Sequence, residues 1–353
     1  MLHLLLAACD SPQLTTNDKP VSEGVDSALP NEGADGDADS DADSDADNDG
    51  DTDTQADDSG ENHTGDSAEP VEEPVIAQFV ALGDAGEGNT NQYAVASVMK
   101  AVCEAQGCDF ALYLGDNFYD NGVDSVDDDQ FQEKFELPYA ELDFPFYVVM
   151  GNHDYGGYGA GYEIWKGSYE IDYTDYSEKW TMPDEYYRQD LGELSLYGLD
   201  TNTIFWGFGA EQQTWLQDEI DNDPNTWNIV FGHHPYLSNG QHGNAGAYEG
   251  FDWLPIADGE AVKTFVEASV CGRADVYIAA HDHLREWIGE ECGTQLIVSG
   301  AGAKTTDIVD RGNTTKFESD IEGFAWIKLQ GDTMTVEFWS MNGTLDYTDT
   351  VTK

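Results

Sequence analysis

Residues 110–117 read FALYLGDN, a run of five apolar side chains that ends on a glycine, an aspartate and an asparagine. Four other stretches repeat this arrangement of an apolar run followed by a polar cluster. They are FVALGDAG at 79–86, FYVVMGNHD at 146–154, IVFGHH at 229–234 and VYIAAHDH at 276–283. Continuous apolar runs of this length are typical of strands that are buried on both faces, so the sequence predicts five interior strands.

Helical patterns separate these strands. Residues 91–106 carry apolar side chains at helical spacing and end before a glycine, and residues 211–220 and 259–270 look similar. Alternating strands and helices predict an α/β fold with largely parallel central strands, whose carboxyl ends lie at one edge of the sheet. We therefore expect the five polar clusters to converge. Three further segments are expected to form strands of a second sheet: 295–299, 324–329 and 333–339.

The converging clusters are rich in side chains that bind metals. They contain Asp84, Asp116, Asn152, His153, His233, His281 and His283, and Tyr119 follows the second cluster. Carboxylates and imidazoles suit Fe, Zn or Mn. The set is large enough for two ions that share a carboxylate, and paired ions about 3.5–4 Å apart recur in displacement at phosphorus. A single histidine in a strand is more often structural, but five clusters at strand ends favour a metal site.

The five clusters, in this order, look like the motifs of calcineurin-like metallophosphoesterases. Tyr119 at the end of the second motif narrows the resemblance to the purple acid phosphatases, and the chain looks most similar to the tartrate-resistant type over residues 76–345. Ala280 departs from the pattern, which usually has glycine there, but this position donates no ligand. The resemblance implies a four-layer α/β/β/α sandwich of two mixed sheets flanked by helices.

The resemblance also implies a dinuclear site with Fe(III) and a divalent ion (Fe, Zn or Mn). The implied ligands are Asp84, Tyr119 and His283 for Fe(III), Asn152, His233 and His281 for the divalent ion, and Asp116 as a bridge between them. A phenolate is a hard anionic donor that favours Fe(III), and its charge-transfer band gives the family its colour. Neutral amide and imidazole donors suit a divalent ion.

In the mechanism that the resemblance implies, a hydroxide on Fe(III) or bridging both ions attacks phosphorus in line with the ester oxygen. His153 and His242 match the two histidines that contact substrate and protonate the leaving group. As imidazolium, either residue could donate a proton and hold phosphate oxygens. The alternative for His242 is an ordinary loop residue in Gly/Asn-rich surroundings. His234 is expected to orient its ligand neighbour, and Asp154 to make structural hydrogen bonds.

Four cysteines besides Cys9 form an even set, which suits an exported protein. Cys103 and Cys108 flank the end of the first predicted helix, and Cys271 and Cys292 bracket the strand and loop that carry the last histidine pair. We therefore predict the disulfides Cys103–Cys108 and Cys271–Cys292. The alternative is four buried free thiols.

The N-terminal residues have a different composition from the rest. A short apolar stretch ends in LAAC at residues 6–9 and resembles the lipobox of a bacterial lipoprotein. On this interpretation residues 1–9 are a signal segment, and acyl chains on Cys9 anchor the exported protein to a membrane of the cell envelope, in the periplasm or at the cell surface. The alternative is an ordinary frayed N-terminus.

Residues 10–74 are predicted to be a disordered, extended tether. Aspartate occupies every second position from Asp35 to Asp53, without a large apolar side chain between them. A second possibility is weak Ca²⁺ binding, because residues 45–53 copy the oxygen spacing of a calcium loop. However, the twelfth position of that loop is Ala56 instead of the bidentate Glu of an EF-hand.

Net charge and composition limit the partners. The chain has 353 residues, 71 acidic against 14 basic side chains and a formal charge of −57, which argues against nucleic acid. No apolar run reaches the eighteen residues that a membrane-spanning helix needs. We expect residues 75–353 to form a monomeric phosphatase that hydrolyses small phosphate monoesters at acidic pH. The alternatives are a phosphodiesterase or nucleotide hydrolase on the same fold, and a calcium-binding surface adhesion protein.

Overall fold

The computed structural model describes residues 73–249 and 257–353. The predictions of a signal segment over residues 1–9 and of a tether over 10–74, with lipidation of Cys9 and calcium binding by the tether, lie outside the described residues except for residues 73 and 74.

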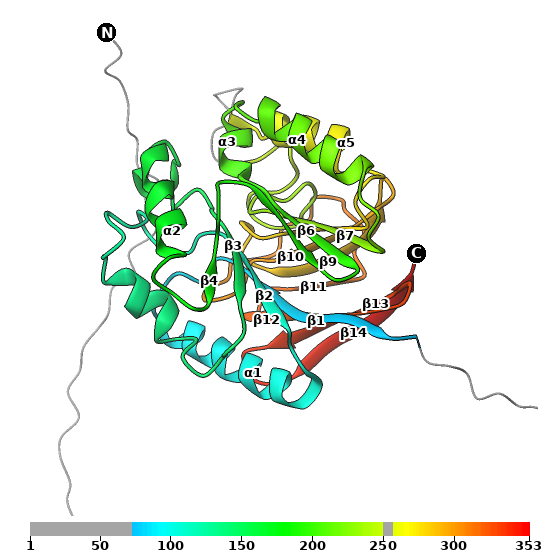
Figure 1. The fold of residues 1–353 in the computed structure, drawn as a ribbon, viewed down its shortest axis with the longest axis horizontal. Coiled ribbons are helices and arrows are strands. Elements are labelled where there is room, and N and C mark those ends of the chain that lie inside the picture. The colour runs from blue at the N-terminus through cyan, green and yellow to red at the C-terminus, as the bar shows by residue number, and fades with distance from the viewer. Residues whose placement is uncertain (1–72, 250–256) are drawn as a thin grey trace, which may run out of the picture. The chain divides into compact units, whose positions relative to one another are not determined.

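The first sheet has the strand order β14-β13-β12-β1-β2-β3-β4 (Figure 1). Its strands are β1 (Val75–Leu82), β2 (Phe110–Leu114), β3 (Phe146–Val149), β4 (Trp180–Thr181), β12 (Gly323–Gln330), β13 (Thr333–Ser340) and β14 (Leu345–Thr352). The strands β1 to β4 pair in parallel, and β12 to β14 continue the sheet in antiparallel fashion beside β1.

The second sheet has the order β11-β9-β10-β8-β7-β6-β5. Its strands are β5 (Tyr187–Leu191), β6 (Leu194–Gly198), β7 (Trp227–Phe231), β8 (Val276–Ala279), β9 (Arg285–Glu291), β10 (Thr294–Ser299) and β11 (Phe317–Ser319). The central strands β6, β7, β8 and β10 pair in parallel, and antiparallel strands lie at both edges.

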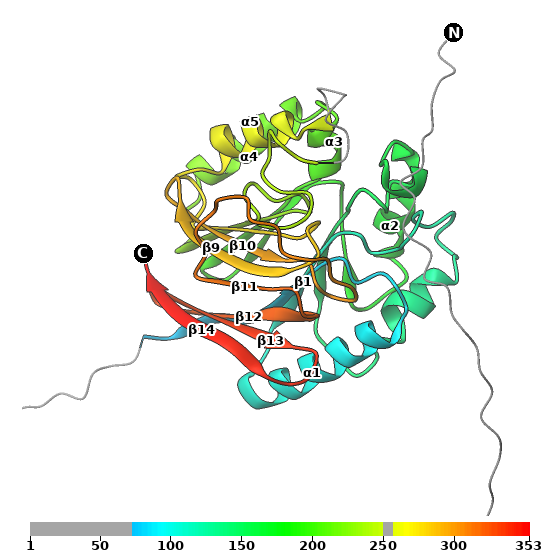
Figure 2. The same cartoon turned by 180° about the vertical axis from the view of Figure 1, so that it is seen from behind.

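Helices cover the outer faces of the two sheets. They are α1 (Thr90–Gln106), α2 (Gly167–Tyr173), α3 (Thr201–Phe205), α4 (Ala210–Asp221) and α5 (Glu260–Ser269). Figures 1 and 2 show α1 on the side of the first sheet and α3, α4 and α5 on the side of the second. The three helices predicted from the sequence are thus present, within one or two residues of the expected bounds.

Two apolar clusters hold these layers together. The larger one contains Met99 of α1, Leu112 of the first sheet and Ile278 of the second, so it includes the space between the sheets. The smaller one joins the outer face of the second sheet to Leu216 of α4 and Val266 of α5. The order helix, sheet, sheet, helix confirms the predicted four-layer sandwich.

One prediction about the sheets is correct only in part. Residues 295–299 lie in the second sheet as β10, which pairs in parallel with β8, whereas 324–329 and 333–339 lie in β12 and β13, which extend the first sheet beside β1. The five motif-bearing strands are also divided, with β1, β2 and β3 in one sheet and β7 and β8 in the other. Apolar patterning predicts that a segment is a strand, but partners far apart in sequence leave no periodic signal.

Both predicted disulfides are present. Cys103, in the last turn of α1, is bonded to Cys108, and Cys271, just after α5, is bonded to Cys292 in the turn between β9 and β10. The second bond encloses β8 and the His281–His283 loop.

Removing the longer disulfide should cost more stability than removing the shorter one. The bonds span 21 and 5 residues. Loop-closure entropy therefore predicts that Cys271→Ala/Cys292→Ala lowers the free energy of unfolding by about 3 kcal/mol, against about 2 kcal/mol for Cys103→Ala/Cys108→Ala. Urea denaturation of the two double variants measures this difference. A larger loss in the Cys103/Cys108 variant would contradict the prediction.

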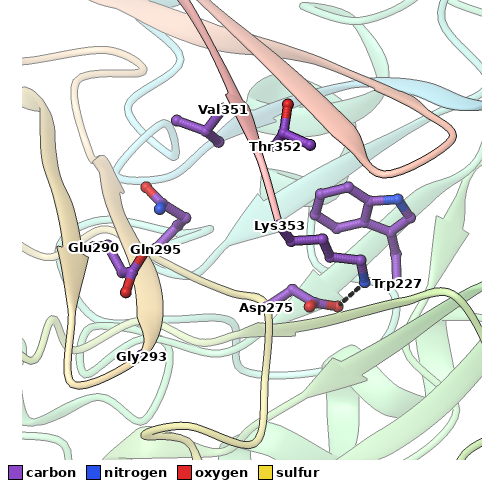
Figure 3. A pocket seen from close by; sticks show the side chains of 8 residues that line it. All are labelled: Trp227, Asp275, Glu290, Gly293, Gln295, Val351, Thr352 and Lys353. Carbon is purple, nitrogen blue, oxygen red and sulfur yellow. Dashed lines mark hydrogen bonds and ion pairs between the residues drawn. The ribbon is translucent and has the colours of Figure 1, made fainter.

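The C-terminus lies at the opposite end of the strands from the polar clusters. The Nζ atom of Lys353 lies 2.9 Å from Oδ2 of Asp275 and 4.3 Å from the centroid of the Trp227 ring (Figure 3). These residues line a small cavity of about 80 Å³ beside the amino ends of β7 and β8. This cavity is therefore separate from the candidate site.

Candidate metal centre

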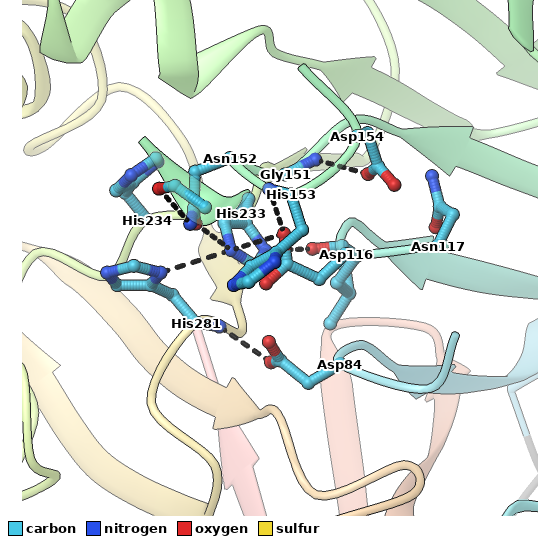
Figure 4. Close-up of polar contacts among 12 residues, drawn as sticks. Asp84, Asp116, Asn117, Gly151, Asn152, His153, Asp154, His233, His234 and His281 are labelled. Carbon is cyan, nitrogen blue, oxygen red and sulfur yellow. Dashed lines mark hydrogen bonds and ion pairs between the residues drawn. The ribbon is translucent and has the colours of Figure 1, made fainter. Parts of the chain in front are cut away.

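The loops after β1, β2, β3, β7 and β8 meet at the carboxyl ends of both sheets. Figure 4 shows Asp84, Asp116, His233 and His281 directed toward one another from these loops. One donor atom from each of Asp84, Asp116 and His233 lies within 4.8 Å of the other two, and all three residues are buried. The convergence predicted from the motifs is thus present, although the strands belong to two sheets.

The backbone is bent sharply where the side chains enter the site. Asp84, Asp116 and His281 have φ values of 53°, 53° and 68°. An L-residue in this left-handed region costs about 1–2 kcal/mol, and such strain is concentrated at functional sites. Gly115 makes room for the bend, since a Cβ atom there would lie 2.6 Å from the amide nitrogen of Gly151 and 2.9 Å from Nδ1 of His233.

Tyr119 joins three of the predicted ligands. Its hydroxyl oxygen lies 2.7 Å from Oδ1 of Asp84, 2.8 Å from Oδ2 of Asp116 and 3.3 Å from Nε2 of His283. The hydroxyl has one hydrogen, so it can donate to only one of the two carboxylates at a time. When both carboxylates are ionised, one of them therefore faces the phenolic oxygen without a proton between the two oxygens.

A second group surrounds Nε2 of His233. The Nδ1 atom of this ring lies 2.9 Å from the carbonyl oxygen of Leu114, which can only accept, so Nδ1 carries the hydrogen and the neutral ring has a lone pair at Nε2. Nε2 lies 3.0 Å from Oδ1 of Asn152, 3.1 Å from Nδ1 of His281 and 3.4 Å from Oδ1 of Asp116. With His281 in the tautomer whose Nδ1 carries no hydrogen, these four atoms are all lone-pair donors, and such a set fits a cation.

Burial supports the same conclusion. It raises the pKa of the Asp84 carboxyl to about 7, with a further contribution from the charge of Asp116. Burial and the two carboxylates also hold the pKa of Tyr119 well above its usual value, and burial with the neighbouring histidines holds the pKa of His281 well below its usual value. Without a cation Asp84 and Tyr119 are driven toward their neutral forms, whereas a bound cation favours their anionic forms, and neutral imidazole is the form that binds metal.

Asp116 lies where the two groups meet. One of its oxygens is close to Tyr119 and the other to His233, and Oδ1 also accepts a hydrogen bond of 2.9 Å from the amide of His153. A carboxylate in this position can contact two ions at once. The seven residues predicted as ligands are therefore brought together in two groups that share Asp116.

His153 and His242 lie beside the two groups. The His153 ring packs against Tyr119 with 4.5 Å between the ring centroids, and its Nδ1 lies 2.8 Å from the carbonyl oxygen of Asp120. The His242 ring stacks on that of His281 at 4.2 Å and 27°. Both side chains are half-buried. Each is thus next to the centre, where the resemblance predicts a residue that contacts the substrate.

His234 and Asp154, which were expected to support the ligands, both have defined hydrogen-bond partners. His234 is buried, with Nδ1 2.9 Å from the hydroxyl of Thr201, and the same hydroxyl accepts from the amide of His233. Asp154 accepts hydrogen bonds from the amides of Phe118 and Gly151, so it ties the second motif to the third. Asp154 therefore makes the structural hydrogen bonds that were predicted.

Sequence reasoning missed Lys304. Its Nζ atom lies 3.0 Å from the centroid of the Tyr119 ring and 2.9 Å from Oε1 of Glu87. Lys304 follows the GAGA stretch at 300–303, which belongs to none of the five motifs. Only its position close behind β10, near the carboxyl ends of the strands, could have suggested it.

Within residues 73–249 and 257–353, no helix combines the length and apolar character that a membrane crossing needs.

Comparison with known proteins supports the same family. The calcineurin-like phosphoesterase family matches residues 77–285. The chain is 26% identical to tartrate-resistant acid phosphatase type 5 of Homo sapiens over 306 residues, which cover 75% of this chain and 88% of that protein. It is 28% identical to purple acid phosphatase 4 of Arabidopsis thaliana over 296 residues, covering 75% and 80%.

A solved structure described as GAP50, the anchor in the inner membrane complex of Plasmodium, has the same fold. It superposes with a TM-score of 0.62 and 21% identity, covering 78% of this chain and 88% of that one. At this identity the likeness concerns the fold alone. With the family match over residues 77–285, however, the chain belongs to the calcineurin-like phosphoesterase family, and it is similar to the tartrate-resistant and purple acid phosphatases.

Proposed function

We propose that this protein hydrolyses small phosphate monoesters at a site for Fe(III) and a divalent ion (Fe, Zn or Mn). The observation that carries the proposal is the pair of donor groups that share Asp116, one containing a tyrosine hydroxyl and the other an amide and two imidazoles. A single structural ion would need only one of these groups.

The roles of the ligands follow from their chemistry. The proposed ligands are Asp84, Tyr119 and His283 for the ferric ion, Asn152, His233 and His281 for the divalent ion, and Asp116 for both. The anionic group suits the trivalent ion, and the group of neutral donors suits the divalent ion. When bound, the two ions supply a hydroxide nucleophile in mild acid and offset the charge of the phosphoryl oxygens.

The histidines beside the two groups would act on the substrate itself. In their protonated forms His153 and His242 can each donate a hydrogen bond to a phosphoryl oxygen, and either can protonate the departing alkoxide. They lie beside different groups, His153 against Tyr119 and His242 against His281. With an ester bound between them, one histidine would donate a hydrogen bond to the phosphoryl oxygens and the other would protonate the leaving group.

Charge favours small substrates. Residues 1–74 carry −21 of the formal −57, which leaves −36 for residues 75–353. A domain this acidic repels polyanions, so small phosphate esters suit it better than DNA or RNA.

The test compares an aryl phosphate monoester with the matching diester at acidic pH. We expect the purified full chain to hydrolyse the monoester at least about tenfold faster, a difference of about 1.4 kcal/mol in the barrier. Chelation should abolish both activities. A diester rate above the monoester rate would replace the proposal with a phosphodiesterase, and hydrolysis of neither ester by the metal-loaded protein would end it.

We also propose that the protein is exported and anchored through Cys9, with residues 1–9 as the signal segment, 10–74 as the tether and 75–353 as the catalytic domain. The two disulfides support an oxidising compartment. Cys9→Ser should move the protein from the membrane fraction to the soluble fraction when it is expressed in a bacterial host. Equal distribution of the two forms would contradict the anchor.

A further inference from the structure

The loop that carries His242 is held by one carboxylate from the last motif. Both oxygens of Asp282 face this loop, with Oδ1 accepting a hydrogen bond of 2.6 Å from the amide of His242 and Oδ2 one of 3.0 Å from the amide of Gly243. Asp282 is fully buried and stands between His281 and His283 in the chain. Hydrogen bonds to a buried carboxylate are among the strong ones in proteins.

Other contacts also hold this loop close to Asp282. A Cβ atom on Gly240 would lie 2.2 Å from Cγ of Asp282, so the backbone passes directly over the carboxylate. Arg311 donates from Nε to the carbonyl of Gly240 at 3.1 Å and from its terminal nitrogen to the carbonyl of Gln241 at 2.5 Å. The stretch 240–243 is therefore fixed through its backbone from two sides.

Fixing the backbone also fixes the ring of His242. The ring stacks on His281, the residue directly before Asp282. The main-chain amide and the side chain of His242 are thus both attached to the dipeptide His281–Asp282. A shift of this loop would move His242 relative to the centre, and small misplacements of a proton donor lower rates strongly.

We propose that Asp282 is the positioning residue for His242, holding it where it serves the leaving group of the phosphate ester. This inference rests on the proposed function. Asp282 is not a metal ligand in this account, since both of its oxygens are occupied by backbone amides. A structural role limited to folding is the competing explanation, and the two differ in what Asp282→Asn should do.

Amide hydrogen exchange tests whether Asp282 holds the loop, and this measurement needs no catalytic activity. Asparagine keeps one acceptor oxygen but turns an NH₂ group toward the second amide, so one hydrogen bond is lost and a repulsive contact appears. We expect the amides of His242 and Gly243 to exchange at least about tenfold faster in Asp282→Asn, which matches the loss of one charge-assisted hydrogen bond. The matched control is Asp275→Asn at the other end of β8, where Asp275 accepts from the amide of Asn228 at 2.8 Å. Unchanged exchange at His242 would overturn the proposal.

Leaving-group dependence tests the consequence for the reaction. p-Nitrophenolate departs without a proton, whereas an alkoxide needs one. Asp282→Asn should therefore lose at least about ten times more rate on an alkyl phosphate than on p-nitrophenyl phosphate, as His242→Ala should. A variant that combines Asp282→Asn with His242→Ala should be no slower than His242→Ala alone, because Asp282 affects the rate only by positioning the His242 ring. Equal losses on both esters, a further loss in the double variant, or loss of bound metal in Asp282→Asn would each overturn the proposal.

The outcomes separate the two proposals. If the metal-loaded wild type hydrolyses neither ester, the proposed function fails, while the exchange experiment still decides whether Asp282 holds the loop. If the wild type is active and Asp282→Asn behaves like Asp275→Asn in both experiments, the positioning role alone fails.

Discussion

Replacing Asp116 by Asn is expected to abolish binding of the metal pair and to lower phosphate-ester hydrolysis by about a thousandfold or more. Asp116 stands between the two donor groups, with its oxygens 2.8 Å from the Tyr119 hydroxyl and 3.4 Å from Nε2 of His233. The amide of asparagine has no charge to offset that of the ions and presents an NH₂ group toward one of them. Elemental analysis of the purified variant, with its rate on an aryl monoester, measures both effects.

The matched control lies at the other end of the same strand. Asp109 precedes β2 and accepts a hydrogen bond of 2.8 Å from the amide of Gln78, at an exposed position. Asp109→Asn makes the same chemical change and should leave metal content and rate as in the wild type. If Asp116→Asn binds two ions per chain as the wild type does, Asp116 is not the bridge.

Replacing Tyr119 by Phe should remove the visible absorption of the iron-loaded protein completely. The expected band arises from a phenolate bound to Fe(III), and phenylalanine has no oxygen to bind. The fold should tolerate the change, since the ring contacts with His153 and Lys304 remain available. The rate should fall by about ten- to a hundredfold, because the loss of one anionic donor weakens the site without removing the bridge. A visible spectrum of the variant beside the wild type measures the effect.

Tyr113 offers the control for this experiment. It lies fully buried in β2, and its hydroxyl has no hydrogen-bond partner among the described residues. Tyr113→Phe therefore deletes the same atom without touching the centre, and the band should persist. A band that survives in Tyr119→Phe would assign the colour to another residue and remove Tyr119 from the ligand set.

The convergence of the candidate ligands was predictable because these residues stand at strand ends. Asp84, Asp116, Asn152, His233 and His281 each follow an apolar run within a few residues, and the carboxyl ends of neighbouring strands lie close together. This argument does not need to know which sheet each strand joins. The convergence is therefore correct although β12 and β13 were assigned to the second sheet and lie in the first.

The supporting residues were not predictable in the same way. Asp282 contacts a loop about 40 positions earlier, Arg311 reaches the same loop from about 70 positions later, and Lys304 lies over a ring 185 positions before it. Contacts between loops have no periodicity, and each of these charged residues reads as a solvated side chain in the sequence. Only the folded chain brings them together.

The fold by itself does not establish the reaction. A structure with the same fold and 21% identity is described as an anchor, so catalysis has to be argued from the donor groups. The most direct measurement is a metal titration of the metal-free full chain, following hydrolysis of an aryl phosphate monoester. We predict no hydrolysis without metal, and a rate that rises to a plateau at two ions per chain when iron and a divalent ion are supplied. Full activity in the metal-free protein, or none after loading with both ions, would contradict it.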